Sequence, residues 1–505
     1  MTFFEPTRDP LIINRRRLMG FLAGAVAAGV ISRSEALAYL QDASQKTGVD
    51  PAKWNPETIQ ALAGTREVDT AGDLHALIPE TTEGTIQYWN VGPSEGEPQI
   101  SFDLYEEFLA TFALYYPNVT LDNQNIGYNE LLDKIRTAAA GGAAPAVAKL
   151  PILWGVEFAG RGDTSEITLE EFGWTADQFW PGALKSDTWE GKLFGVPTNN
   201  ETMAFIYNKQ IFADAGLDPE SPPATWGDVV AYSKQIKDET GKNGYGMVCK
   251  VNAGNTPFRF MPVMWAYGGS ALDEAVDAPT YDNTMINTPE GIAALQVYYD
   301  MYVRDQSVPT SALTNTQVEN QDLFIAGEIA MMISHPSEYI AMRGRAEKAT
   351  GADKERADAI VANMSYGLIP EGPVRRAVVF GGSNAHIFSD AAHGEPVNRD
   401  AARALIAAIT GPEWSLKLNW AGSNPANLIG FETEWMKQRL EEIKFLEVTT
   451  SMLPYGIPFP VVPESPEVMN IIVPEMLQNA LTESMTVEEA ANDAAERINA
   501  LIASR

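Results

Sequence analysis

The chain has 505 residues, of which 45% are hydrophobic and 10% aromatic, and its formal net charge is −31. Because single cores stop growing at about 250–300 residues, two or more lobes are expected. The hydrophobic content excludes a disordered chain, and the acidity excludes nucleic acid and anionic lipid as partners.

The amino terminus has the order of an export signal: arginines at Arg15–Arg17, an apolar run at Leu18–Ile31, and small residues at Ala36–Ala38. The run is shorter than the about 20 residues that a membrane span needs. Its adjacent arginines resemble a twin-arginine signal, and an amphipathic surface helix is the alternative. We expect residues 1–38 to be removed. No cysteine directly follows the run, so we expect a soluble periplasmic protein without a lipid anchor.

Residues 39–83 are polar and rich in turn formers, and we interpret them as an extension ahead of the main fold. Strands and helices then alternate in the order β-α-β-α-β, which predicts an α/β lobe with a mostly parallel sheet. The expected segments are a strand at Gly84–Gly92, a helix at Gln99–Pro117, a strand up to Gly127, a helix at Tyr128–Gly142 and a strand-like run at Ala146–Trp154.

A similar alternation follows. The segment Thr202–Asn208 is expected to be a strand, and Thr225 with Asp228 is expected to cap the next helix. Further helices are predicted at Thr225–Gly241, Thr288–Asp305, Asn320–Ser334 (continuing into a strand after Gly327), Arg399–Thr410 and Thr486–Ala503.

Motifs of enzymes and metal sites are missing from the sequence. It has no GxSxG, P-loop or HExxH pattern, one cysteine (Cys249) and four scattered histidines. We therefore expect no metal and no cofactor. The 67 carboxylates make accidental pairs inevitable, so a glycosidase pair cannot be identified from sequence.

The segment from Gly191 to Ile236 carries a specific pattern. It contains Gly195-Val196-Pro197, Tyr207-Asn208-Lys209, Ala215-Gly216-Leu217 and Pro222-Pro223-Ala224-Thr225-Trp226. This order resembles the signature of the bacterial extracellular solute-binding proteins of the large sugar-binding family, which serve ABC importers. The maltose-binding type is the best known.

Other segments resemble the family in the same order, and together they cover about Gly84 to Ile502. They include Ala266–Glu274, Leu323–Tyr339 and Gly381–Phe388. One departure is Pro145-Ala146-Val147, where the family's third strand usually begins Pro-Asp-Val.

The resemblance implies an α/β, two-lobed periplasmic binding protein fold, in which each lobe is a mostly parallel sheet flanked by helices and a multi-strand hinge joins the lobes. The expected first lobe comprises residues 84–199 and 370–420, and the second residues 200–369 and 421–505. Chain crossings are expected near Thr198–Thr202, Pro370–Gly381 and Ala421–Asn427.

The function that the resemblance implies is the capture of a small carbohydrate in an interlobe cleft and its delivery to a membrane ABC permease, without catalysis. A mono- or disaccharide or a polyol is expected as ligand, and a monomer as the assembly. Two alternatives stay open. A binding protein used for sensing would lack neighbouring permease genes, and an exported glycoside hydrolase would turn over a chromogenic glycoside.

Sugars have polar edges and apolar faces, so their sites need flat aromatic rings together with carboxylates or amides. The resemblance and the strand ends place such groups in the cleft. The candidate ligand-binding residues are Trp89, Asn90, Trp154, Asn199, Asn200, Glu201, Phe258, His335, Ser337, Tyr339, Gly382, Ser383, Asn384, Trp420 and Asn424.

The polar candidates have structural alternatives. Asn199 and Asn200 would suit a plain turn, because Asn tolerates the left-handed conformation. Glu201 would suit a solvated surface charge, and His335 a hydrogen-bonded loop. Ser337 stands where the family's loop carries a stacking aromatic, which argues against a long maltodextrin.

Burial in the core is the alternative for the aromatic candidates Trp154, Phe258 and Trp420. Two other tryptophans, Trp226 and Trp265, fall on predicted helices, and we expect both in the core rather than in the site.

Overall fold

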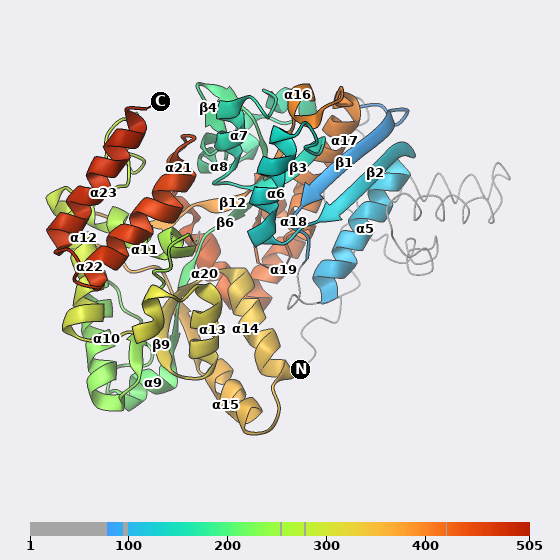
Figure 1. The fold of residues 1–505 in the computed structure, drawn as a ribbon. Coiled ribbons are helices and arrows are strands. Elements are labelled where there is room, and N and C mark those ends of the chain that lie inside the picture. The colour runs from blue at the N-terminus through green and yellow to red at the C-terminus, as the bar shows by residue number, and fades with distance from the viewer. Residues whose placement is uncertain (1–77, 94–98, 253–254, 277–278, 421, 505) are drawn as a thin grey trace. The chain divides into compact units, whose positions relative to one another are not determined.

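The computed structural model describes residues 78–504 except 94–98, 253–254, 277–278 and 421 (Figure 1). The expected export signal at residues 1–38 and most of the expected extension at 39–83 lie outside the described residues. Across the described part, no helix is long and apolar enough to cross a membrane.

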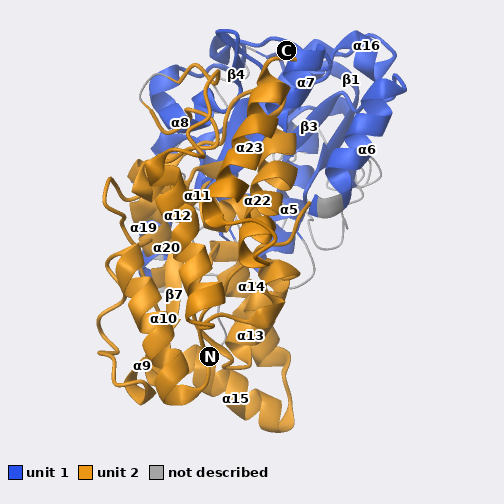
Figure 2. Ribbon diagram, turned by 60° about the vertical axis from the view of Figure 1, so that its left-hand side comes forward, with its two compact units in different colours: residues 1–200, 382–442 blue, residues 201–381, 443–505 orange. Residues whose placement is uncertain are grey.

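The chain divides into two compact units (Figure 2). Unit 1 takes in the described residues up to Asn200 together with Gly382–Glu442, and unit 2 takes in Glu201–Gly381 and Ile443–Arg505. The chain therefore passes between the units after Asn200, after Gly381 and after Glu442.

This division differs from the expected lobes at Asn200, which belongs to unit 1, and in two longer stretches. Residues 370–381 belong to unit 2 because β11 (Val378–Val379) pairs with β14 (Gly456–Ile457). Residues 421–442 belong to unit 1 because β13 (Asn424–Pro425) pairs with β6 (Val196–Glu201). The third passage consequently lies after Glu442 and not at residues 421–427.

Unit 1 is built on a six-stranded sheet in the order β13-β6-β12-β3-β1-β2. The strands β1 (Glu83–Asn90), β2 (Asn118–Asn125) and β3 (Val147–Pro151) are parallel, as the β-α-β order predicts. β12 (Gly381–Ile387) is antiparallel to β3, with Ser383 opposite Pro151. The chain thus enters β12 at the edge of the sheet where β3 ends, which fixes the opposite direction.

The core of unit 1 lies between this sheet and its helices. α5 (Gln99–Tyr115) packs on β2 and α17 (Arg399–Thr410) packs on β1 (Figure 1). The bounds of α17 are those predicted from its alanine-rich amphipathic pattern, and the Asn398 side chain caps its first turn. The remaining helices of unit 1 are α6 (Tyr128–Ala140), α7 (Gly155–Arg161), α8 (Pro181–Lys185), α16 (Asp390–His393), α18 (Pro412–Lys417) and α19 (Glu434–Glu442).

Unit 2 contains a four-stranded sheet in the order β10-β7-β9-β8. β7 (Ala204–Asn208) is antiparallel to both β9 (Ile329–Ser334) and β10 (Met364–Gly367), while β8 (Asn243–Tyr245) is parallel to β9. The expectation of a mostly parallel sheet is therefore wrong for this unit.

Helices surround the sheet of unit 2, and several begin at the predicted caps. Thr225 and Asp228 form the expected capping box of α10 (Trp226–Thr240), and Thr288 caps α12 (Pro289–Tyr299). The other helices are α9 (Lys209–Asp214), α11 (Asn255–Tyr267), α13 (Gln317–Ile325), α14 (Pro336–Lys348), α15 (Gly351–Ala362), α20 (Lys444–Met452), α21 (Ser465–Glu467), α22 (Val473–Leu481) and α23 (Val487–Ile502). Trp226 and Trp265 are fully buried, as expected.

Candidate functional site

In unit 2, two strand ends bring a carboxylate and an imidazole together. β6 ends at Glu201 and β9 ends at Ser334, directly before His335. His335 Nε2 lies 2.9 Å from Glu201 Oε2, and the two side chains are 17% and 27% exposed. The two side chains are therefore partly buried. Electrostatic attraction is stronger at a partly buried position than on a fully exposed surface.

The other ring nitrogen of His335 caps a helix. Nδ1 accepts the Ser337 backbone N–H at 3.2 Å at the start of α14 and lies 2.7 Å from Ser337 Oγ. A nitrogen that accepts an N–H carries no proton, so a neutral His335 ring with this cap would carry its proton on Nε2. Burial acts to lower the pKa of His335, but the carboxylates of Glu201 and Glu338 together raise it, and the net direction is upward.

A second carboxylate in this region already has a partner. Glu338 forms a buried ion pair with Arg259 of α11, whose guanidinium also donates to Asn255. Glu338 further accepts the Ser334 hydroxyl and the His335 backbone N–H, each at 3.3 Å. The Arg259–Glu338 pair is thus internally neutral, and Glu201 is the more exposed carboxylate of the group.

An aromatic ring lies next to this polar group. A methyl group added at Gly381 would lie 3.5 Å from Glu201 Cβ and 3.6 Å from the Phe258 ring. Phe258 is half-buried and packs edge-on against Phe459, with ring centroids 5.1 Å apart. The Glu201 side chain and the Phe258 ring therefore both border Gly381.

Tyr339 does not join this group. It is 6% exposed and packs against Phe445 and Tyr366 in the core of unit 2, with ring centroids 4.9 and 5.9 Å away. Its hydroxyl accepts a hydrogen bond from Arg343 at 2.8 Å. The structure gives Tyr339 a packing role, and its contact with a ligand stays a prediction.

In unit 1, the polar residues Asn199 and Asn200 lie in strand β6, so the alternative of a plain turn is wrong. Asn199 accepts the Thr198 hydroxyl at 3.1 Å. Asn200 is fully buried, and its amide donates to the Pro425 carbonyl at 3.1 Å. Asn200 thus holds β13 against β6, which is a structural role within the sheet. Its contact with a ligand stays a prediction.

The glycine at the start of β12 is required by packing. Gly382 has a φ of 136°, and a methyl group there would lie 2.2 Å from the Asn199 carbonyl oxygen. Ser383 is half-buried, and its carbonyl accepts the Thr198 hydroxyl at 2.8 Å. Asn384 is buried and donates to Ser186 Oγ at 3.0 Å. Gly382 and Ser383 therefore lie next to the Thr198–Asn199 segment of β6, whereas the Asn384 amide faces the interior of unit 1.

A lysine that is not among the candidate ligand-binding residues lies near the same strands. Lys149 of β3 donates to Asn419 Oδ1 at 3.0 Å, and the Asn419 amide donates to the Thr198 carbonyl at 3.3 Å. The available signal was a lone lysine within an otherwise apolar strand. Lys149 and Asn419 are thus further candidates for polar contacts in unit 1.

The late candidates Trp420 and Asn424 are both buried. The Arg439 guanidinium lies 4.9 Å from the centroid of the Trp420 ring and donates to the Asn419 and Ser423 carbonyls. Burial lowers the pKa of Arg439 to about 9. Asn424 pairs with Asn200 across β13 and β6. Both candidates therefore belong to the packed end of the sheet.

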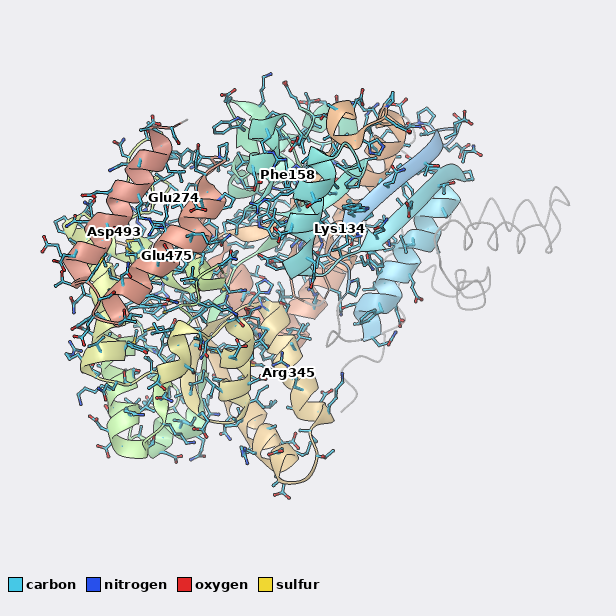
Figure 3. The ribbon with its side chains drawn as sticks, in the orientation of Figure 1. Lys134, Phe158, Glu274, Arg345, Glu475 and Asp493 are labelled. Atoms are coloured by element: carbon cyan, nitrogen blue, oxygen red, sulfur yellow. The ribbon has the colours of Figure 1, made fainter. Side chains whose placement is uncertain are left out.

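The candidates on β1 have partners of their own. Lys134 of α6 (Figure 3) lies over the Trp89 ring, 4.3 Å from its centroid. The Asn90 amide donates to Tyr105 Oη at 3.0 Å and to Asn123 Oδ1 at 2.9 Å. One face of Trp89 is thus occupied by an ammonium group, a cation–π arrangement.

Trp154 packs against an exposed tyrosine. Its ring centroid lies 5.1 Å from that of Tyr128, which is 38% exposed. Tyr128 begins α6, next to the carboxyl ends of β1 and β2, where open α/β sheets place their ligands. Helical spacing alone assigned Tyr128 to a helix start and gave no sign of this contact.

The candidates therefore gather in separate groups. Unit 2 brings together Glu201, Phe258, His335 and Ser337. Unit 1 brings together Asn199, Asn200, Gly382, Ser383 and Asn424 at β6, β12 and β13, with Trp89, Asn90 and Trp154 at the ends of β1 and β3. Among the described residues, no group of three or more His, Cys, Asp or Glu side chains could hold a metal ion.

Comparison with known proteins gives the family. Residues 101–415 match the family model described as bacterial extracellular solute-binding protein. A protein of Brucella abortus described as a binding protein is 24% identical over 422 residues, which span 82% of this chain and 89% of that protein. The sn-glycerol-3-phosphate-binding periplasmic protein UgpB of Pectobacterium atrosepticum is 24% identical over 63% of this chain and 68% of its own length.

A solved structure gives the fold. An ABC transporter solute-binding protein of Thermotoga lettingae, bound with α-D-tagatose, superposes with a TM-score of 0.67 at 23% identity. The match covers 83% of this chain and all of the other. The two units are therefore the lobes of a periplasmic binding protein fold. Since the family model spans more than half of the sequence, the chain belongs to the bacterial extracellular solute-binding protein family.

Proposed function

We propose that this protein is the extracytoplasmic solute-binding component of an ABC importer, and that it captures a small carbohydrate for delivery to a membrane permease. Family membership and the tagatose-bound neighbour support this proposal. A mono- or disaccharide or a polyol is the ligand that we propose, in a monomeric protein of the periplasm, without catalysis.

The observation that carries the proposal is the group formed by Glu201, His335, Ser337 and Phe258. The carboxylate and the hydroxyl can exchange hydrogen bonds with sugar hydroxyl groups. The Phe258 ring offers the apolar surface on which the C–H face of a sugar packs. A surface salt bridge would not need a half-buried aromatic ring beside it, so the combination favours a carbohydrate.

Binding would act by selecting one state of the two-lobed protein. A ligand shifts a conformational equilibrium only by the difference in its affinity for the two states. We propose that the ligand binds the closed form more tightly, and that the permease docks that form. Asn199, Ser383 and Lys149 are the polar candidates that we propose for unit 1.

A thermal-shift screen against sugars, polyols and glycerol phosphates tests the proposal. A ligand at a hundred times its dissociation constant adds about 2.7 kcal/mol to the free energy of unfolding. A matched sugar should therefore raise the Tm clearly. A rise with sn-glycerol-3-phosphate and none with any neutral sugar or polyol would replace the carbohydrate assignment with a phosphorylated ligand.

The second candidate function is an exported glycoside hydrolase. It would need two site carboxylates, about 5–5.5 Å or about 6.5–9.5 Å apart. In the candidate group of unit 2, Glu338 is committed to Arg259, which leaves Glu201 as the accessible acid. Turnover of a chromogenic glycoside that disappears in Glu201→Gln would favour the hydrolase.

A further inference from the structure

Four polar side chains meet where the first two strands of unit 1 end. β1 and β2 run parallel, and their last residues, Asn90 and Asn125, are paired. Asn123 lies two residues before the end of β2, so it shares a face of the sheet with Asn125. α5 packs on β2 and contributes Tyr105 to this group (Figure 1). Open α/β sheets bind ligands outside the carboxyl ends of their strands, which is where these side chains lie.

The phenol of Tyr105 joins the three amides. Asn90 Nδ2 donates to Tyr105 Oη at 3.0 Å and to Asn123 Oδ1 at 2.9 Å. Three amide oxygens surround Tyr105 Oη, at 2.8 Å (Asn123), 2.9 Å (Asn125) and 3.3 Å (Asn90). The hydroxyl has one proton, and Asn123 Oδ1 already accepts an N–H, so the largest number of groups is satisfied when this proton goes to Asn125. The four side chains thereby form one hydrogen-bonded network.

The network has a buried part and an exposed part. Asn90 is 1% exposed, Tyr105 and Asn123 are half-buried, and Asn125 is exposed. Both hydrogens of the Asn90 amide are used inside the network, so Asn90 has no N–H for a ligand. Asn123 and Asn125 turn their oxygens toward the network, and their N–H groups have no acceptor among the described residues. The donors that a ligand could use are therefore those of Asn123 and Asn125.

We propose that Asn123 and Asn125 form a hydroxyl-binding subsite of unit 1, and that Asn90 and Tyr105 are the positioning residues that hold these two amides. This inference rests on the proposed carbohydrate-binding function, for which it names further polar contacts. An amide N–H donates to the oxygen of a hydroxyl group. Two residues on one face of a strand are about 7 Å apart at the backbone, so both amides can contact one sugar ring.

The residue types at these strand ends are unfavourable for a sheet. Asparagine is depleted in strands, yet β2 ends in Asn123-Gln124-Asn125 and β1 ends beside it in Asn90. Burial of an amide also destabilises a fold unless the amide is hydrogen-bonded. Residues that break local folding rules are expected at functional sites. A binding role explains why amides stand where β-branched residues would stabilise the sheet.

A glycine makes room for the exposed amide. A methyl group added at Gly92 would lie 2.4 Å from Asn125 Cγ and 2.4 Å from its Nδ2. The Asn125 side chain thus lies against the backbone of Gly92, which restrains it in addition to Tyr105. A side chain that is already held in place loses less conformational freedom when a ligand binds, and this favours affinity.

Asn125→Ala is the informative variant. Asn125 is exposed, and the Tyr105 hydroxyl can turn to Asn123 when it is removed, so the variant should keep the Tm of the parent. Its affinity for the neutral sugar or polyol with the largest thermal shift should fall by about fivefold, as expected for one lost hydrogen bond between uncharged groups. Gly92→Ala displaces the same amide without removing it and should lower the affinity in the same direction.

Asn118→Ala is the matched control. Asn118 is an exposed asparagine at the first residue of the same strand, about 23 Å from Asn125 along β2. Its substitution makes the same chemical change at the amino end of the strand and should leave the affinity at the value of the parent. A loss in Asn118→Ala equal to that in Asn125→Ala would show a general effect on β2 and overturn the inference.

Tyr105→Phe tests the positioning role, because it removes the hydroxyl and keeps the ring. A purely structural role would lower the Tm alone. The inference predicts in addition a loss of affinity and a mobile Asn125 amide in the side-chain ¹⁵N relaxation of the whole chain, where the parent amide is rigid. An equally rigid amide in both proteins would overturn the positioning role.

The outcomes separate the subsite from the proposed function. A parent that binds a neutral sugar or polyol with the same affinity as Asn125→Ala and Gly92→Ala overturns the subsite and leaves the proposed function standing. A parent that binds no neutral sugar or polyol overturns the proposed function, and the subsite with it.

Discussion

His386 Nε2 lies 3.2 Å from Asp187 Oδ2 in the interior of unit 1, and both side chains are withdrawn from solvent. Two glycines make room for this pair. A methyl group at Gly155 would lie 2.1 Å from Asp187 Oδ1, and one at Gly195 would lie 2.2 Å from Oδ2. The pair therefore occupies space that any larger residue at these positions would fill.

Gly155→Ala tests this packing. The added methyl group would force Asp187 and His386 apart in a closely packed interior, so we expect the free energy of unfolding to fall by about 1–3 kcal/mol. Gly141→Ala is the control, because a methyl group there meets nothing closer than 3.4 Å. Urea denaturation of both variants measures the difference. Equal stability of the two variants would contradict the packing account.

Asp187→Asn tests the charge of the buried pair. Burial raises the pKa of Asp187 above its usual value, against the attraction of His386. A carboxyl whose pKa is raised on folding stabilises the protein most below its unfolded pKa of about 3.9, and this contribution is lost as pH rises through the raised value. The stability of the parent relative to Asp187→Asn should therefore decline as pH rises through that window. A relative stability that grows with pH would show that His386 outweighs burial.

Gly382→Ala addresses the start of β12. The residue has a φ of 136°, and the new methyl group would lie 2.2 Å from the Asn199 carbonyl oxygen, which is a backbone atom. Gly241→Ala is the comparison, since Gly241 has a φ of 72° with nothing within 4 Å of the added group. We expect about 1 kcal/mol for Gly241→Ala from backbone strain alone and a clearly larger loss for Gly382→Ala. The midpoints of thermal unfolding show which of the two variants loses more stability. A larger loss in Gly241→Ala would be inconsistent with the close approach of β12 to β6.

Phe258→Ala tests the aromatic surface of the candidate site. If a sugar face packs on this ring, removal of the ring should weaken affinity by about tenfold or more, as expected for about 1.5–3 kcal/mol of lost burial. Phe258→Leu keeps an apolar group but no flat face, so it should recover part of the affinity. Isothermal titration with the ligand found in the thermal-shift screen measures both. Unchanged affinity in Phe258→Ala would return Phe258 to a packing role.

Local patterns in the sequence predicted the elements of the fold well. The capping box of Thr225 and Asp228, the amphipathic helix Arg399–Thr410 and the turn at Gly327 before β9 are signals carried by neighbouring residues. Such signals survive in the folded chain because caps and periodicity act over one or two turns.

Those local patterns could not predict which strands distant in sequence would pair. The pairing of Asn424 with Asn200 assigns residues 421–442 to unit 1, and it joins segments more than two hundred residues apart. No local signal encodes which distant strand a short edge strand will pair with. The same reason explains why the antiparallel order of β7 and β9 was missed.

In the candidate site, too, single residues could be predicted from the sequence, whereas their contacts could not. Glu201 and Phe258 were named from the resemblance, and the structure brings both to Gly381. The contact of Glu201 with His335 depends on the pairing of Ala204 with Ser334, which sequence spacing does not specify. Tyr339 was named for its place in a loop, but α14 turns its ring into the core.

The most direct test of the carbohydrate assignment is isothermal titration of the chain without residues 1–38, using the neutral sugar or polyol that gives the largest thermal shift, in the parent and in Glu201→Ala. The account predicts saturable heat for one site in the parent and a loss of affinity in the variant of about tenfold or more, because a charged hydrogen-bond acceptor contributes about 1.5–3 kcal/mol. Absence of saturable heat with every neutral sugar and polyol would contradict the carbohydrate assignment, and unchanged affinity in Glu201→Ala would contradict the site.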